Sequence, residues 1–247
     1  MYFTWYVCCF LYLCPILGVI YGLAQGYRVI GVDYKYDPPG TRICPQQRGN
    51  SYKRFRDKKV FGIDEGMSDV NVSPAESILN RITKLLLFLA KTRPSSEGWG
   101  FYIDNYLPNW PVIALTGHSQ GSGHAAFLAK RFPLYRVMLN SSPWDHYVNP
   151  FVIDDWLKAP SQTPSSRWYG LFDAKDSHAH VMRSTYPALG LEQEKNFRVL
   201  DLEPQKRDGD FGHFQVLGWA YGPLTANGQQ YAYQPDWIWQ LGSGKPS

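Results

Sequence analysis

Apolar and polar positions along the 247-residue chain form short blocks whose spacing predicts strands and helices in alternation. Runs rich in β-branched and aromatic residues predict strands at residues 27–34, 111–115, 136–140, 167–172 and 197–202. Helices are predicted at 73–91, at 121–132, around 235–241, and in a helix-prone stretch between the last two strands. Because strands alternate with helices, the predicted fold class is α/β, a mostly parallel sheet with helices on both faces.

Two segments interrupt this alternation. Residues 35–72 are rich in proline, glycine and charge, and we expect a long irregular excursion there. The basic run at 53–59 has the composition of a solvated loop, with an anion-binding or membrane-surface patch as the alternative. Residues 144–165, with Trp144, Trp156 and several prolines, form an insertion that either lines a substrate pocket or is a plain surface cap.

The N-terminal part of the chain is apolar, and its first charged side chain is Arg28. One interpretation is a signal peptide or membrane anchor, because about 20 apolar residues span a bilayer. It favours a secreted or membrane-associated protein over a cytoplasmic one. The other interpretation is a core strand followed by a core helix. We therefore divide the chain into an apolar segment at 1–26, through which membrane association could occur, and an α/β domain at 27–247.

Bulk composition narrows the class of protein. Hydrophobic residues make up 44% of the chain and charged residues 19%, which is typical of a folded domain. A net charge of +4 is too small to indicate a nucleic-acid partner. Three of the four cysteines lie among the first 14 residues, so their spacing indicates neither a disulfide framework nor a metal site.

The strongest chemical signal is Gly117-His-Ser-Gln-Gly121, which lies between a predicted strand and a predicted helix. A serine on such a turn is held with its hydroxyl above the end of the sheet, and the glycines permit the close backbone approach that the turn requires. The N-terminus of the following helix would stabilise an anion formed at Ser119. The pattern therefore predicts a nucleophile; the alternative is a glycine-rich turn with an idle serine.

A serine nucleophile needs a general base, and the base needs a carboxylate. In a strand–turn–helix site of this kind the chain order is serine, then acid, then histidine. His118 and His124 lie in the turn and the helix after it, whereas His213 follows the last predicted strand. We predict His213 as the base, the alternative being a surface loop histidine.

Three aspartates are candidates for the acid: Asp176, Asp173 and, less favourably placed, Asp145. The first two follow the strand at 167–172, and spacing alone does not separate them. Helix capping is the alternative role for any of the three. Asp176 with His178 and His180 would also fit a metal cluster, but the sequence offers no second group of ligands.

These motifs resemble the α/β-hydrolase superfamily. The resemblance rests on the Gly-His-Ser-Gln-Gly turn, the Ser-Ser-Pro that follows, and a Tyr-Gly stretch before the acid, as in uncharacterised microbial members, and it runs from about Leu23 to the C-terminus. It implies Ser119 as nucleophile, Asp176 as acid, His213 as base and the Gln120 N–H as one oxyanion donor. It also implies no cofactor and no metal.

The chain departs from this family near its N-terminus. Family members begin with further strands and carry a His-Gly motif that supplies a second oxyanion N–H, but no His-Gly pair occurs in the first 110 residues. The missing strand would leave a gap beside the strand at 27–34. We expect residues 4–13 to fill that gap, residues 15–25 to form the crossover helix, and the loop around Cys14 to supply the second donor. The rival interpretation is an N-terminally truncated chain.

The predicted function is carboxylic-ester hydrolysis through a Ser-Asp-His triad and an acyl-enzyme, with a small-molecule ester as the partner. Thioesters and amides use the same chemistry. The alternative is a catalytically impaired or truncated protein that keeps the fold and acts by binding.

Overall fold

The computed structural model describes residues 4–9, 22–47, 49–207, 209–218 and 221–242. Its centre is a six-stranded sheet in which every neighbouring pair of strands is parallel. In spatial order the strands are β10 (Phe197–Leu200), β9 (Trp168–Asp173), β6 (Arg136–Asn140), β5 (Ile113–His118), β1 (Thr4–Cys9) and β2 (Tyr27–Val32). The α/β class predicted from the sequence is confirmed.

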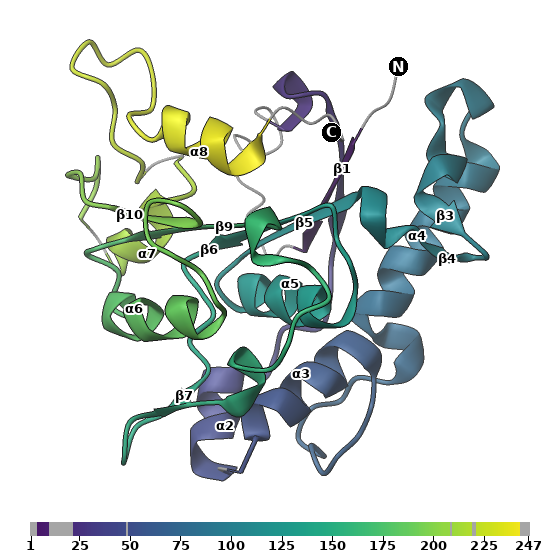
Figure 1. Cartoon of the computed structure of the whole chain (residues 1–247), viewed down its shortest axis with the longest axis horizontal. Coiled ribbons are helices and arrows are strands. Elements are labelled where there is room, and N and C mark those ends of the chain that lie inside the picture. The colour runs from purple at the N-terminus through teal and green to yellow at the C-terminus, as the bar shows by residue number, and fades with distance from the viewer. Residues whose placement is uncertain (1–3, 10–21, 48, 208, 219–220, 243–247) are drawn as a thin grey trace.

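Helices cover both faces of this sheet (Figure 1). Those described are α2 (Gly40–Gln47), α3 (Ser51–Phe61), α4 (Ile78–Thr92), α5 (Gln120–Arg131), α6 (Ala179–Ala188), α7 (Phe211–Gln215) and α8 (Gln234–Leu241). Helices α5 and α6 lie on one side of the sheet and α8 lies on the other. Two short antiparallel pairs are added, β3 (Ile103–Asp104) with β4 (Leu107–Pro108), and β7 (His146–Tyr147) with β8 (Val152–Ile153).

Alternation along β5 explains the two covered faces, since successive side chains of a strand point to opposite sides. Ile113 and Leu115 belong to the main core, which also contains buried side chains of α4 and α5. Ala114, between them, packs with Met138 and with Leu241 of α8 on the other face. Apolar residues at the successive positions 113–115 fit a sheet that is covered on both sides.

Strand β1 lies between β2 and β5, where the sequence hypothesis put residues 4–13. Cys9 is in register with Val32 on one side and with Gly117 on the other. The backbone N–H and C=O groups of β2 and β5 that face the gap are therefore paired with β1. Of the expected crossover helix at 15–25, residues 22–24 are helical, and residues 10–21, including the loop around Cys14, lie outside the described part.

Within the described residues, no helix combines the length and apolar character that a bilayer crossing needs.

The prediction of a solvated loop for the basic run at 53–59 is wrong, because this run forms most of α3. Arg56 is 3% exposed and Lys59 is 1% exposed. The Lys59 ammonium is held by the backbone carbonyls of three residues of the preceding loop, Lys35, Tyr36 and Asp37. Buried hydrogen bonds, rather than water, solvate these two cations, and they fasten α3 to the body of the domain.

The predicted helix at 73–91 begins later than expected. The capping box at Ser73 and Glu76 closes a separate 3-10 turn, and α4 starts at Ile78. Ser77 is its N-cap and accepts a hydrogen bond from the Asn80 N–H. Ser73 and Ser77 are thus the caps of two separate elements, the 3-10 turn and α4.

Candidate active site

Ser119 lies on a strained turn between the end of β5 and the start of α5. Its backbone has φ 54° and ψ −130°, a region that non-glycine residues rarely occupy and that costs about 1–3 kcal/mol. A Cβ on Gly117 would lie 2.3 Å from the backbone carbon of Gly121, so the turn is tight enough to require glycine there. The Gly-x-Ser-x-Gly pattern therefore marks a real geometric constraint.

The turn is fastened to the neighbouring strand β6. The Ser119 N–H donates to the Asn140 carbonyl at 3.0 Å, and the Asn140 side-chain amide donates to the Gly117 carbonyl at 3.0 Å. The fully buried Ser122 hydroxyl bridges the carbonyls of the same two residues. This network holds the strained serine in one position, as a pre-organised nucleophile requires.

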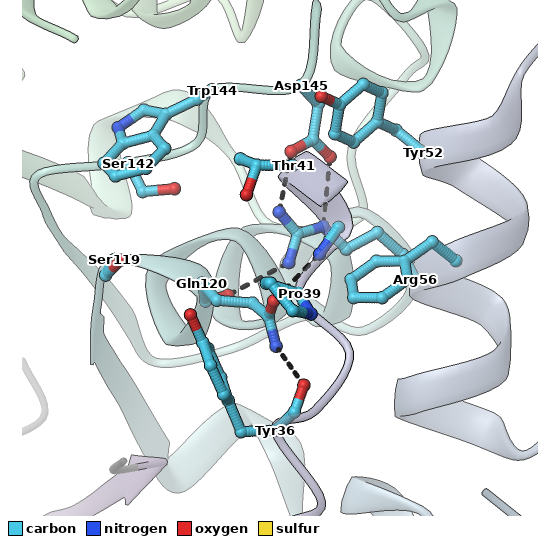
Figure 2. A pocket seen from close by; sticks show the side chains of 12 residues that line it. Tyr36, Pro39, Thr41, Tyr52, Arg56, Ser119, Gln120, Ser142, Trp144 and Asp145 are labelled. Carbon is cyan, nitrogen blue, oxygen red and sulfur yellow. Dashed lines mark hydrogen bonds and ion pairs between the residues drawn. The ribbon is translucent and has the colours of Figure 1, made fainter. Parts of the chain in front are cut away.

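Gln120 is the first residue of α5, so its backbone N–H has no acceptor within the helix. Its side-chain oxygen accepts from the Gly40 N–H at 3.1 Å, and its carbonyl accepts from the Arg56 guanidinium at 3.0 Å (Figure 2). The backbone N–H that the resemblance implies as an oxyanion donor therefore belongs to a residue whose side chain and carbonyl are both held by hydrogen bonds. Cys9, the last residue of β1, is in register with Gly117. The residues around Cys14 that were expected to supply a second oxyanion donor lie outside the described part.

Arg56 of α3 is a site residue that sequence reasoning missed. Its guanidinium forms a two-point ion pair with Asp145, at 3.0 and 2.7 Å, and approaches His124 Nδ1 at 3.2 Å. A Cβ on Gly123 would lie 2.1 Å from this guanidinium, so Gly123 makes the room for it. Burial first, and then the Arg56 charge, lower the pKa of His124 well below its ordinary value. No pattern in the basic run distinguishes Arg56 from its neighbours.

A small cavity of about 30 Å³ opens beside Ser119 and Gln120 (Figure 2). Its other walls come from the start of α2, from α3, and from the loop after β6, which contributes Ser142 and Trp144. The excursion at 35–72 and the start of the insertion at 144–165 therefore meet at the candidate nucleophile. Of the two roles expected for the insertion, this geometry supports the pocket-lining one for Trp144.

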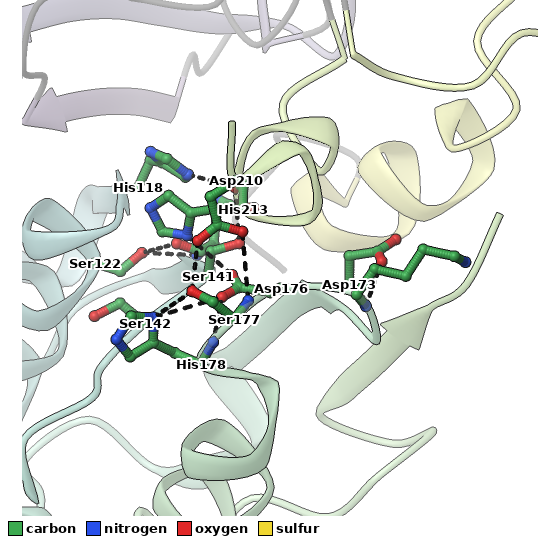
Figure 3. Close-up of polar contacts among 12 residues, drawn as sticks. His118, Ser122, Ser141, Ser142, Asp173, Asp176, Ser177, His178, Asp210 and His213 are labelled. Atoms are coloured by element: carbon green, nitrogen blue, oxygen red, sulfur yellow. Dashed lines mark hydrogen bonds and ion pairs between the residues drawn. The ribbon is translucent and has the colours of Figure 1, made fainter. Parts of the chain in front are cut away.

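His213 of α7 forms a buried pair with Asp176, which follows β9 (Figure 3). Its Nδ1 lies 2.9 Å from Asp176 Oδ2, and the two residues are 6% and 4% exposed. A carboxylate can only accept, so Nδ1 carries the proton and Nε2 is left as the basic nitrogen. A Cβ on Gly212 would lie 2.3 Å from the Lys175 backbone, which shows how closely the two loops approach.

His118 supports the backbone of His213. The carbonyl of His213 lies 2.8 Å from His118 Nε2 and accepts from the Ser141 hydroxyl at 3.1 Å. Burial, and then the nearby His213, lower the pKa of His118 to about 3. His118 is therefore neutral at physiological pH and acts here as a hydrogen-bond donor. The Trp144 ring also contacts the His213 ring, with centroids 4.9 Å apart.

The structure separates the three candidate acids. Asp173, the alternative that spacing left open, accepts from the Tyr233 hydroxyl at 2.8 Å, and burial raises the pKa of its carboxyl. Asp145 is occupied by Arg56 and by the Trp156 indole N–H, at 2.8 Å. Among these three, Asp176 is the carboxylate that contacts His213.

The structure does not bring together Asp176, His178 and His180, the three residues considered above as a metal cluster. His180 is exposed, while Asp210 instead lies beside Asp176 and His178, with one potential ligand atom from each within 4.8 Å of the others. The carboxylate of Asp176 already accepts from His213 and from the His178 N–H, at 2.8 Å. These three residues could supply three ligand atoms to a cation.

The hydroxyl of Ser119 has no hydrogen-bond partner among the described residues, His213 included. Catalytic hydrogen bonds are commonly long before substrate binds. The sequence matches no protein-family model, and it has no significant similarity to a curated protein. What the chain does must therefore be argued from the site itself.

Proposed function

We propose that the chain is a serine hydrolase with an α/β-hydrolase fold, which hydrolyses carboxylic esters. The observation that carries the proposal is the buried pair of His213 Nδ1 and Asp176 Oδ2, 2.9 Å apart, in segments that follow β10 and β9 at the same sheet edge as the strained Ser119. One place combines a strained backbone, an imidazole oriented by a carboxylate, and a helix N-terminus. Backbone strain of this kind destabilises the fold and is commonly found at functional sites, so the combination supports a chemical role.

The order of the elements supports the same proposal. Ser119 follows β5, Asp176 follows β9, and His213 follows β10, so all three come after the carboxyl ends of parallel strands. Sites in parallel α/β sheets are built at these ends. The order serine, acid, histidine is also the one implied by the resemblance to α/β-hydrolases.

In the proposed mechanism, His213 Nε2 takes the proton of the Ser119 hydroxyl as the oxygen attacks the ester carbonyl. The Gln120 N–H stabilises the oxyanion, and Asp176 stabilises the imidazolium. The imidazolium then gives its proton to the leaving alcohol, and the C–O bond breaks to leave an acyl group on Ser119. His213 then deprotonates a water molecule, which attacks the acyl carbonyl. The bond between the acyl carbon and the Ser119 oxygen breaks, the imidazolium returns its proton to that oxygen, and the carboxylic acid is released.

The test is hydrolysis of p-nitrophenyl acetate together with labelling by a fluorophosphonate, read as a mass increase on the peptide containing Ser119. Both should occur in the wild type and vanish in Ser119→Ala. The matched control is Ser96→Ala, which changes an exposed serine and should behave like the wild type. Turnover that persists in Ser119→Ala, or a folded wild type that neither turns over nor labels, would overturn the proposal.

One observation favours the alternative of a binding protein with a degraded site. Ser119 lacks a hydrogen bond to His213 in the described structure. Loss of one oxyanion donor typically lowers the rate about 100- to 1000-fold. Under this alternative the wild type folds, melts cooperatively, and shows neither labelling nor turnover.

A further inference from the structure

We propose that the cavity beside Ser119 is the acyl site, and that it limits the substrates to esters of short acyl groups of two or three carbons. The inference rests on the proposed function, because it assigns a substrate class to the same serine. It concerns a space bounded by Ser119, Gln120 and Trp144 together with α2 and α3.

The described lining of the cavity includes the nucleophile but not the base. Its lining includes Ser119 and Gln120, which carry the nucleophile and the oxyanion donor. His213 is not among the described residues that line it, and Trp144 stands between the two, lining the cavity and packing on the His213 ring. Because the leaving alcohol must receive its proton from His213, it lies on the His213 side. The acyl group is then directed into the cavity.

The size of the cavity sets the length of the acyl group. Its volume of about 30 Å³ is roughly a tenth of the smallest pockets that hold drug-sized ligands, which span about 300–1,000 Å³. It has room for a few groups the size of a water molecule. We expect an acetyl or propionyl chain to be enclosed in this space, and an octanoyl chain to extend beyond it through its opening.

The walls of the cavity are held firmly, so that a longer chain cannot easily widen it. The Arg56–Asp145 ion pair forms one wall and is itself bonded to the Gln120 carbonyl. Gly40 is tied to the Gln120 side chain, and a Cβ at Gly40 would already lie 3.0 Å from the Phe55 ring. Close-packed walls of this kind resist the insertion of additional methylenes.

The chemistry of the walls also disfavours long alkyl chains. Ser142 is 2% exposed, and its hydroxyl has no hydrogen-bond partner among the described residues. Figure 2 shows this hydroxyl turned toward the side of the cavity where Thr41 lies. An alkyl chain would exclude water and leave a buried hydroxyl without a partner, which is unfavourable. A short acyl group leaves room for water, or for a polar substituent, at Ser142.

The first experiment measures kcat/KM of the wild type for the p-nitrophenyl esters of acetate, butyrate and octanoate. We expect a fall of at least about tenfold from acetate to butyrate, and a further fall to octanoate, because a single methylene already changes kcat/KM by about tenfold or more in a fitted pocket. Octanoate hydrolysed as well as acetate would overturn the inference.

The second experiment enlarges the cavity. Tyr36 lines it and is partly exposed at 36%, so Tyr36→Ala should remove one wall without opening the core. The ratio of butyrate to acetate kcat/KM should rise about tenfold. Tyr106→Ala, at an 80% exposed position in the turn between β3 and β4, is the matched control and should leave the ratio unchanged. An unchanged ratio in a folded Tyr36→Ala variant would contradict the inference.

The two proposals fail in different ways. If Ser119 is neither labelled nor active, the proposed function itself is wrong. If Ser119 is labelled and turns over esters, but long chains are preferred or Tyr36→Ala leaves the ratio unchanged, only the acyl-site inference is wrong.

Discussion

Two buried pairs of a carboxylate and a basic side chain flank Ser119, and they are built in opposite ways. In the pair of Arg56 and Asp145, both carboxylate oxygens and most of the guanidinium are bonded within the protein. In the pair of His213 and Asp176, one imidazole nitrogen is bonded and the other has no partner among the described residues. The first pair is fully bonded within the protein, whereas the second keeps one imidazole nitrogen that is not bonded among the described residues.

The contrast shows how burial of charge can serve two purposes. An arginine stays protonated at any ordinary pH, so its buried ion pair can only hold α3, the turn at Ser119 and the loop after β6 together. An imidazole can gain and lose a proton near neutral pH, so its pair with a carboxylate is suited to proton transfer. Both pairs lie near Ser119, so proximity does not distinguish a structural pair from one suited to proton transfer. The distinction comes from the second nitrogen of His213, which is not bonded among the described residues.

The largest expected effect comes from removing the carboxylate charge of the pair of His213 and Asp176. Asp176→Asn keeps the shape of the side chain but favours the wrong imidazole tautomer, and should lower kcat/KM for p-nitrophenyl acetate by about 10⁴-fold. Asp173→Asn is the matched control, because Asp173 bonds Tyr233 rather than His213, and should change kcat/KM only a few-fold. The reverse outcome would show that Asp173 is the acid.

A second effect concerns the pair of Arg56 and Asp145. Arg56→Met leaves Asp145 buried without its cation and should lower the free energy of unfolding, measured in urea, by about 3–5 kcal/mol. Replacing both partners, with Arg56→Met and Asp145→Leu together, should recover most of that loss. Lys91→Met, at an exposed position of α4, should change stability by no more than about 0.5 kcal/mol. If the double variant is no more stable than Arg56→Met, the pair does more than neutralise buried charge.

The smallest effect concerns His118, which packs against His213. Its folded pKa of about 3 lies below the ordinary value of 6.5, so between these limits the unfolded chain binds a proton that the folded chain excludes. Stability should therefore fall as the pH drops from 6.5, by up to about 1.4 kcal/mol per pH unit from this group. Unfolding measured at pH 6 and pH 5 should show a shallower pH dependence in His118→Asn. His180→Asn, at an exposed position, should keep the wild-type pH dependence.

Local patterns predicted the parts of the site that depend on local geometry. The glycines around Ser119 reflect a tight turn, and chain order placed a histidine after the last strand of the sheet. The choice of Asp176 over Asp173 came from the resemblance, since both follow the same strand, and only packing decides which of them contacts His213. Strand β1 was inferred from a gap in the sheet together with the aromatic, β-favouring composition of residues 4–13.

The role of Arg56 could not be read from the sequence, because it depends on a contact with Asp145, 89 residues away. A run of lysines and arginines looks the same whether it faces water or a buried carboxylate. The small cavity could not be predicted for the same reason, since its walls come from four separate segments of the chain. Nonlocal packing of this kind leaves no periodic signal.

The central position of β1 has a consequence for how the protein is made. Its two neighbours are β2 and β5, and β5 begins about a hundred residues later in the chain. At about 5–20 residues per second, a ribosome needs roughly 5–20 s to deliver that partner. During this interval an apolar strand, within a stretch that has no charged side chain before Arg28, waits with one edge unpaired. The central sheet therefore cannot be completed until β5 has been synthesised, and during that time one edge of β1 is open to association with other chains.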